Sequence, residues 1–354
     1  MISTRKRPLL LGGMLLPTVA GPYQSSLAQG ATPATPALPL PPTQPATGPG
    51  GADYVYDEVV ATAYREDGSL FQEERNSVPH FWLFEPAVPH TGNRPADAPL
   101  PVVLFVHGCC IGAGSIGPEY EQSWIDHLVR RGAVVVYPIH RGTMETAREA
   151  TVAALAELTS SEHVPVDLDR VSLVGYSIGG PLAVDLAATP PEGLPAPAAL
   201  FVLAPDWWPP ETDLGTIPEA TRVVLVELED DQWIPAEWLE DWRTALAMVP
   251  AERRAFVTLR SDDHGAPALV GDHYVGFTEG ELFGSILGVD ALDWYGTWKL
   301  LDGLMGCAFE GEWCEYAFGD TPEVRFMGTW SDGVPVTEAL VIEDAGTPEA
   351  TPSG

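Results

Sequence analysis

One serine stands in a setting that can make it a nucleophile. The motif GYSIGG at 175–180 follows an apolar run that predicts a strand and opens a segment that predicts a helix. So tight a turn leaves no room for bulky side chains two residues before or after the serine, which accounts for Gly175 and Gly179. The turn exposes the hydroxyl, and the helix start offers unpaired N–H groups to a developing negative charge. The pattern therefore predicts covalent catalysis by Ser177.

In this strand–turn–helix context, the motif resembles the nucleophile elbow of the α/β-hydrolase superfamily. The resemblance covers about residues 100–306 and is strongest to the serine esterase branch: dienelactone hydrolases, chlorophyllase-like esterases and secreted polyesterases. Dienelactone hydrolases proper use a cysteine nucleophile, so their specific reaction does not transfer to Ser177. The resemblance implies an α/β fold, with a mostly parallel central sheet and helices on both faces. No large lid is expected, because only residues 204–221 separate the two strands that would flank one.

The resemblance also implies an oxyanion hole. The residues HGCC at 107–110 end an apolar strand and are similar to the HG loop of the superfamily. The implied donors are the backbone N–H groups of Ile178 and Cys109, with Cys110 as the alternative to Cys109. His107 is expected to be a structural residue of this loop, since it precedes the nucleophile in the chain.

The remaining triad members are implied by position. Relatives often carry an acid three residues before a Val/Ile-Pro pair, and Asp231 has this spacing to Ile234, while its neighbour Asp230 could replace it. The implied base is His264, on the loop after the last expected strand, which completes the chain order nucleophile, acid, histidine. The other histidines are interpreted as ordinary: His80, His90, His127, His140, His163 and His273.

Two tryptophans follow a strand that should end near the nucleophile. Trp207 and Trp208 begin the short segment 204–221, so they are candidates to wall a substrate pocket. Packing in an ordinary aromatic core is an equally good interpretation.

The elements that position these residues alternate along the chain. Two β-rich segments, 54–64 and 78–84, open the folded body. Short apolar runs then predict buried strands at 101–106, 133–137, 170–174, 198–203, 222–227 and 255–259. Helical patterns occupy 119–131, 143–158, 178–188, 236–248 and 290–305. This alternation predicts a mostly parallel sheet, whose sites lie at the carboxyl ends of its strands.

The charge of the chain excludes some partners. The 354 residues include 50 Asp and Glu against 18 Lys and Arg, a formal net charge of −32. Such a surface repels nucleic acid and anionic lipid headgroups, so neither is an expected partner. The sequence contains no zinc spacing, phosphate loop or dinucleotide fingerprint, so we expect no metal and no cofactor.

The two ends differ from the body in composition. Residues 1–28 have a basic start, a short apolar run and small residues before Gln29, which predicts a cleavable signal peptide and secretion. The apolar run is too short to span a bilayer. Residues 29–52 predict a Pro/Ala/Thr-rich linker, 53–342 the hydrolase domain, and 343–354 a disordered tail. Within the domain, 307–342 is a C-terminal extension with strand-like pieces that could form an appended hairpin.

Four cysteines are too few for a scaffold built on disulfides. Cys307 and Cys314 are close in sequence with Gly311 between them, so the chain can bend back and we expect them to pair. Cys109 and Cys110 are adjacent, and adjacent Cα atoms lie below the usual disulfide range, so we expect them reduced or strained.

Together these features predict a secreted serine hydrolase that cleaves small or medium carboxylic esters through Ser177, His264 and Asp231. Acyl transfer to another acceptor, or amide cleavage, would use the same triad. A non-catalytic secreted binding module on a hydrolase scaffold is the alternative from a different class, although such modules typically lose a triad member.

Overall fold

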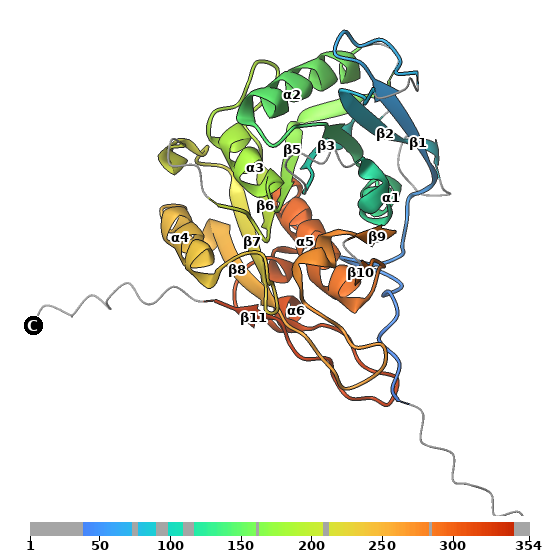
Figure 1. Cartoon of the computed structure of the whole chain (residues 1–354), viewed down its shortest axis with the longest axis vertical. Helices are drawn as coiled ribbons and strands as arrows, with labels where there is room; N and C mark the ends of the chain where they lie inside the picture. The colour runs from blue at the N-terminus through green and yellow to red at the C-terminus, as the bar shows by residue number, and fades with distance from the viewer. Residues whose placement is uncertain are drawn as a thin grey trace, which may run out of the picture. The chain divides into compact units, whose positions relative to one another are not determined.

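The apolar runs of the sequence form one large sheet in the computed structural model (Figure 1). The model describes residues 38–72, 77–89, 98–108, 117–160, 163–207, 212–282 and 285–342. The expected signal peptide at 1–28 and the expected tail at 343–354 lie outside these residues.

The sheet has nine strands in the order β1-β2-β4-β3-β5-β6-β7-β8-β11. The central strands β4, β3, β5, β6, β7 and β8 run parallel, while β1, β2 and β11 are antiparallel to their neighbours. The strands are β1 (Tyr56–Tyr64), β2 (Phe81–Pro89), β3 (Leu100–Val106), β4 (Val134–Pro138), β5 (Val166–Tyr176), β6 (Ala199–Leu203), β7 (Arg222–Leu228), β8 (Arg254–Leu259) and β11 (Leu340–Val341). A separate two-stranded sheet joins β9 (Glu281–Leu282) to β10 (Ser285–Ile286).

Helices cover both faces of the sheet, which explains why the strands β3, β4 and β6 are apolar throughout (Figure 1). Every residue of β3, β4 and β6 is buried. On one face lie α1 (Gln122–Arg130) and α5 (Trp298–Phe309). On the other face lie α2 (Met144–Leu158), α3 (Gly179–Ala188) and α4 (Ala236–Leu246). The α/β class with a mostly parallel sheet is therefore as predicted.

Residues 38–52 do not behave as the spacer that their composition predicted. The N–H of Gly50 donates to the Asp302 carboxylate at 2.8 Å, and the N–H of Leu40 donates to the Ser331 hydroxyl at 2.9 Å. Gly50 adopts a φ of +76°, and a Cβ there would lie 1.9 Å from the Trp294 carbonyl oxygen. These close contacts show that 38–52 packs on α5 and the C-terminal segment, so a linker boundary at 52 is wrong.

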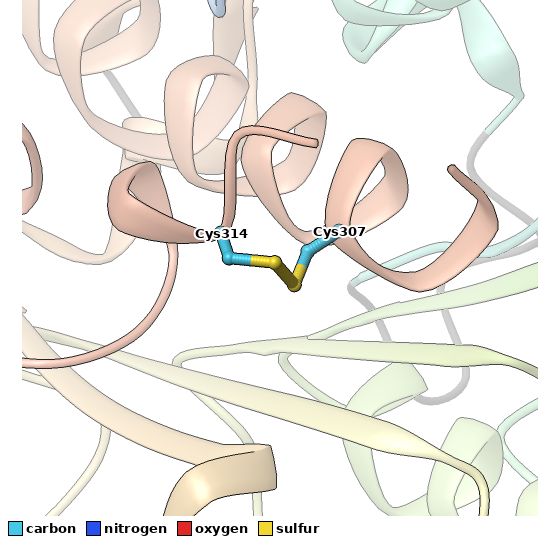
Figure 2. The surroundings of a disulfide bond; sticks show 2 residues. All are labelled: Cys307 and Cys314. Carbon is cyan, nitrogen blue, oxygen red and sulfur yellow. A yellow bond between two sulfur atoms is a disulfide. The ribbon is translucent and has the colours of Figure 1, made fainter. Parts of the chain in front are cut away.

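The C-terminal segment 307–342 is part of the same body. It begins within α5, continues through turns and the short helix α6 (Pro322–Arg325), and ends in β11, which pairs with the sheet edge at β8. A single bridge between Thr329 and Pro335 is the hairpin-like part of the segment. Cys307, near the end of α5, is joined by a disulfide to Cys314 in the following turn (Figure 2), the pairing that the spacing predicted.

Among the residues that the structure describes, no helix combines the length and the apolar character required to cross a bilayer.

Candidate active site

The chain makes a strained turn where β5 gives way to α3. Ser177 has a φ of +53°, in the left-handed region that side chains other than glycine seldom adopt. The turn also brings backbones together: a Cβ on Gly179 would lie 2.0 Å from the Val106 carbonyl oxygen, and one on Gly175 would lie 2.6 Å from the Gly179 carbonyl oxygen. Only glycine fits at these two positions, so the sequence pattern reflects a real steric requirement.

Ser177 is one end of a chain of three hydrogen-bonded side chains. Nε2 of His273 lies 2.9 Å from Oγ of Ser177, and Nδ1 of the same ring lies 2.7 Å from Oδ2 of Asp231. All three side chains are largely buried. The ring can accept the serine proton at one nitrogen while the carboxylate holds the other N–H, which is the arrangement of a nucleophile, a general base and an orienting acid.

Asp231 is fixed by the turn that follows β7. Its Oδ1 accepts the backbone N–H groups of Trp233 at 2.8 Å and Ile234 at 3.0 Å, which leaves Oδ2 for His273. The Trp233 ring stacks on the His273 ring with centroids 6.1 Å apart, although Trp233 is 55% exposed. One oxygen of the carboxylate is therefore bound to its own turn and the other to the imidazole.

The neighbouring aspartate faces elsewhere. Oδ2 of Asp230 accepts the Ser261 hydroxyl at 2.5 Å, and the Asp230 N–H donates to the Gly271 carbonyl at 2.9 Å. The structure thus brings Asp231, and not Asp230, to the histidine, because the turn after β7 directs the two adjacent side chains to different partners.

The expected base, His264, is not at the site. Its Nε2 lies 2.8 Å from Oδ2 of Asp332, and its side chain is 37% exposed. The loop after β8 first bends back at a bridge between Asp262 and Leu269, and only then returns to Ser177 at the 3₁₀ turn η4 (His273–Gly276). The assignment of His264 is therefore wrong in its geometry, and the interpretation of His273 as an ordinary histidine is wrong as well.

A weak signal for His273 was present in the sequence. Asp272 precedes it, and its side chain accepts the N–H of Tyr274, which caps the turn η4. Aspartate is a preferred residue at such starts, so the residues DHYVG at 272–276 fit a capped turn that could present a histidine. The fold brings the second histidine after β8, and not the first, to Ser177.

The turn at the end of β3 is held by a pair of buried histidines. The rings of His107 and His140 stack with centroids 3.9 Å apart. Nδ1 of His107 lies 2.8 Å from the Gly108 oxygen, and Nε2 of His140 lies 2.9 Å from the His107 oxygen, so both nitrogens carry a proton, because a carbonyl only accepts. Burial lowers the pKa of His140 to about 4, and burial and then the nearby His140 lower the pKa of His107 well below its ordinary value. Both rings are neutral near pH 7, which fits the structural role expected of His107.

Of the other residues expected at the site, the structure describes Ile178 and Trp207. Ile178 is the N-cap residue directly before α3, next to Ser177. Trp207 directly follows Asp206, whose N–H donates to the Ser177 carbonyl at 3.0 Å, and Trp207 is 55% exposed. Cys109, Cys110 and Trp208 lie outside the described residues. Within the ranges that are described, no group of three or more His, Cys, Asp or Glu is arranged to hold a metal ion.

Comparison with known proteins gives little further information. No protein-family model matches the chain. The non-reducing polyketide synthase ascC of Acremonium egyptiacum is 27% identical over 132 residues, which are 33% of this chain and 6% of that synthase. The chain thus spans a small fraction of the length of this similar protein, and the likeness does not assign a family.

Proposed function

We propose that this protein is a serine hydrolase of the α/β-hydrolase fold that cleaves carboxylic esters through an acyl-enzyme. The observation that carries the proposal is the hydrogen-bonded series Ser177, His273 and Asp231, on a strained turn between a buried strand and a helix. Sheet order, strand direction and the chain order of the three residues all agree with this fold.

The geometry supports a two-step reaction. Nε2 of His273 removes the proton from Oγ of Ser177 as the oxygen attacks the acyl carbon. Asp231 holds the Nδ1 proton and stabilises the imidazolium that forms. The imidazolium then returns its proton to the leaving alcohol, and water activated by His273 hydrolyses the acyl-enzyme.

The oxyanion of the tetrahedral intermediate needs donors that are already in place. The N–H of Ile178, at the start of α3, belongs to the first turn of a helix, where N–H groups lack partners within the helix and the dipole favours negative charge. The turn at 107–108 lies against the same elbow, because Gly179 closely approaches the His107 carbonyl. We propose that the N–H of Cys109, with Cys110 as the alternative, supplies the second donor.

Two other reactions would use the same three residues. Acyl transfer to an alcohol and amide cleavage would both proceed through the same acyl-enzyme, and they differ from ester hydrolysis only in the acceptor or the leaving group. Catalysis is favoured over a non-catalytic binding module because all three triad positions are filled and joined by hydrogen bonds. Secretion through a cleaved segment at 1–28 remains part of the proposal on sequence grounds alone.

The test is turnover of short p-nitrophenyl esters by the wild type and by Ser177→Ala. The proposal expects hydrolysis by the wild type and a loss of about 10³-fold or more in Ser177→Ala, with unchanged circular dichroism. Repeating the assay with a primary alcohol in excess separates the alternatives, because a transferase forms the new ester in preference to the free acid. Hydrolysis that survives in a folded Ser177→Ala would contradict the proposal.

A further inference from the structure

Tyr176, the residue directly before Ser177, contacts the backbone of His273, the proposed base. Tyr176, the last residue of β5, is completely buried, and its hydroxyl donates to the backbone carbonyl of His273. Its ring lies 5.6 Å from the His273 ring and 4.9 Å from the Phe277 ring, measured between centroids. One side chain thus joins the elbow that carries Ser177 to the turn that carries the histidine.

Two glycines enclose the ring of Tyr176 on the parts of the chain that build the site. A Cβ on Gly108 would lie 2.7 Å from the ring, and a Cβ on Gly276 would lie 2.6 Å from it. Both distances are shorter than real contacts, so the backbone itself packs on the ring in each case. The ring therefore fills the space between the turn after β3 and the turn η4, with no side chain between.

The hydroxyl of Tyr176 is a permanent donor. Burial first, and then the nearby carboxylates of Glu121 and Asp231, raise the pKa of Tyr176 well above its ordinary value. The phenol consequently keeps its proton across the working range of an enzyme, and the His273 carbonyl can only accept it.

These contacts matter because the turn η4 is short. It has four residues and follows residues 260–272, which form no helix or strand and contain a single isolated bridge, between Asp262 and Leu269. The position of the His273 imidazole depends on where this turn lies relative to the turn that carries Ser177. A shift of about 1 Å in a reacting group can lower the rate about 10²-fold.

We propose that Tyr176 is a positioning residue, which sets the place of the His273 imidazole relative to Ser177 by holding the His273 carbonyl from the position next to the nucleophile. The part of this inference that is measured by ester turnover rests on the proposed function. A residue that only filled the core would affect stability alone, whereas a positioning residue affects turnover with little effect on substrate binding.

The experiment compares Tyr176→Phe with the matched control Tyr295→Phe. Tyr295 also donates its hydroxyl to a carbonyl, that of Thr43 at 3.1 Å, and also packs edge-on against a phenylalanine, Phe326. We expect kcat of Tyr176→Phe on a p-nitrophenyl ester to fall about tenfold or more with KM nearly unchanged. Tyr295→Phe should keep the kcat of the wild type. A second variant, Gly276→Ala, keeps the hydroxyl but pushes on the ring, and it should lower kcat in the same way.

A second readout does not depend on turnover. The proton that Nδ1 of His273 donates to Asp231 should give a downfield proton NMR signal, and the loss of that signal in Asp231→Asn would assign it. The inference expects this signal to shift or broaden in Tyr176→Phe and to stay unchanged in Tyr295→Phe. If Tyr176→Phe keeps both kcat and the signal of the wild type, the inference is overturned. If the wild type hydrolyses no ester, the proposed function fails, and the NMR signal still decides the role of Tyr176.

Discussion

Nε2 of His273 lies 2.9 Å from Oγ of Ser177, although the two residues are 96 positions apart in the chain. They meet because β5 and β8 run parallel in one sheet, and the loop after β8 returns over the carboxyl ends of the strands. Sites of open α/β sheets form at that edge. The contact between these two residues is therefore a consequence of the sheet topology.

The two adjacent aspartates after β7 should differ sharply in effect. Asp231→Asn keeps the shape of the side chain but removes the charge that would stabilise the imidazolium, and it can favour the wrong histidine tautomer. We expect turnover of a p-nitrophenyl ester to fall by about 10⁴-fold, as in the template triad. Asp230→Asn, which loses a contact with the Ser261 hydroxyl, is the matched control and should cost little. If Asp230→Asn lost turnover while Asp231→Asn kept the turnover of the wild type, the assignment would be reversed.

Gly179→Ala should damage the elbow. The new Cβ would lie 2.0 Å from the Val106 carbonyl oxygen and 2.5 Å from that of His107, and both are backbone atoms that cannot rotate away. We expect a loss of about 1–3 kcal/mol in the free energy of unfolding, together with reduced turnover. Gly288→Ala is the control, because a Cβ there meets nothing within 4 Å. Urea denaturation of both variants checks this, and equal midpoints would refute the steric argument.

How far the sequence could predict this site depends on the range of the interactions involved. Ser177 and Asp231 stand in short local patterns, where a tight turn or the residues just before Ile234 limit what can occur. The choice between His264 and His273 depends instead on the path of a loop, which is set by the bridge from Asp262 to Leu269. No local spacing encodes that path.

The same reasoning explains the error at residues 38–52. Their Pro, Ala and Thr content is typical of a spacer, and no periodic pattern marks them as structured. Their order comes from partners far along the chain, such as Asp302 for Gly50 and Ser331 for Leu40. Composition reports local preference, so it could not predict contacts with residues about 250–290 positions away.

Asp262 should anchor the C-terminal segment in a way that depends on pH. Its Oδ2 accepts the N–H of Thr337 at 2.7 Å and Nε1 of Trp330 at 3.1 Å. Burial raises the pKa of Asp262, but hydrogen bonds from the Thr337 and His264 N–H groups outweigh it and hold the pKa below its ordinary value. A carboxyl with a lowered folded pKa stabilises the protein above its unfolded pKa, about 3.9, and loses this contribution as pH falls through the folded pKa.

We therefore expect Asp262→Asn to lower the free energy of unfolding by about 2 kcal/mol near pH 7. The difference from the wild type should be constant between pH 5 and pH 7 and should shrink below about pH 4. Asp263→Asn, on the exposed neighbour, is the control. Urea midpoints across this pH range test the prediction, and a deficit that grows toward low pH would contradict it.

The disulfide between Cys307 and Cys314 should stabilise the end of α5 without affecting the site. Closing so short a loop contributes about 2–3 kcal/mol in the chain-entropy model. The double variant Cys307→Ser/Cys314→Ser should therefore have a lower Tm and unchanged turnover. Peptide mapping without reduction should find these two cysteines bonded to each other, and a bond from either to Cys109 or Cys110 would refute the pairing.

The most direct test of the account is covalent labelling by a fluorophosphonate, followed by intact mass and peptide mapping. The account predicts one adduct, on Ser177, formed rapidly by the wild type and by His264→Ala, and slower by about 10³-fold or more in His273→Ala. His264 is a matched control because it too is a histidine bonded to an aspartate, but away from the serine. Rapid labelling of Ser177 in His273→Ala, or its loss in a folded His264→Ala, would contradict the proposed triad.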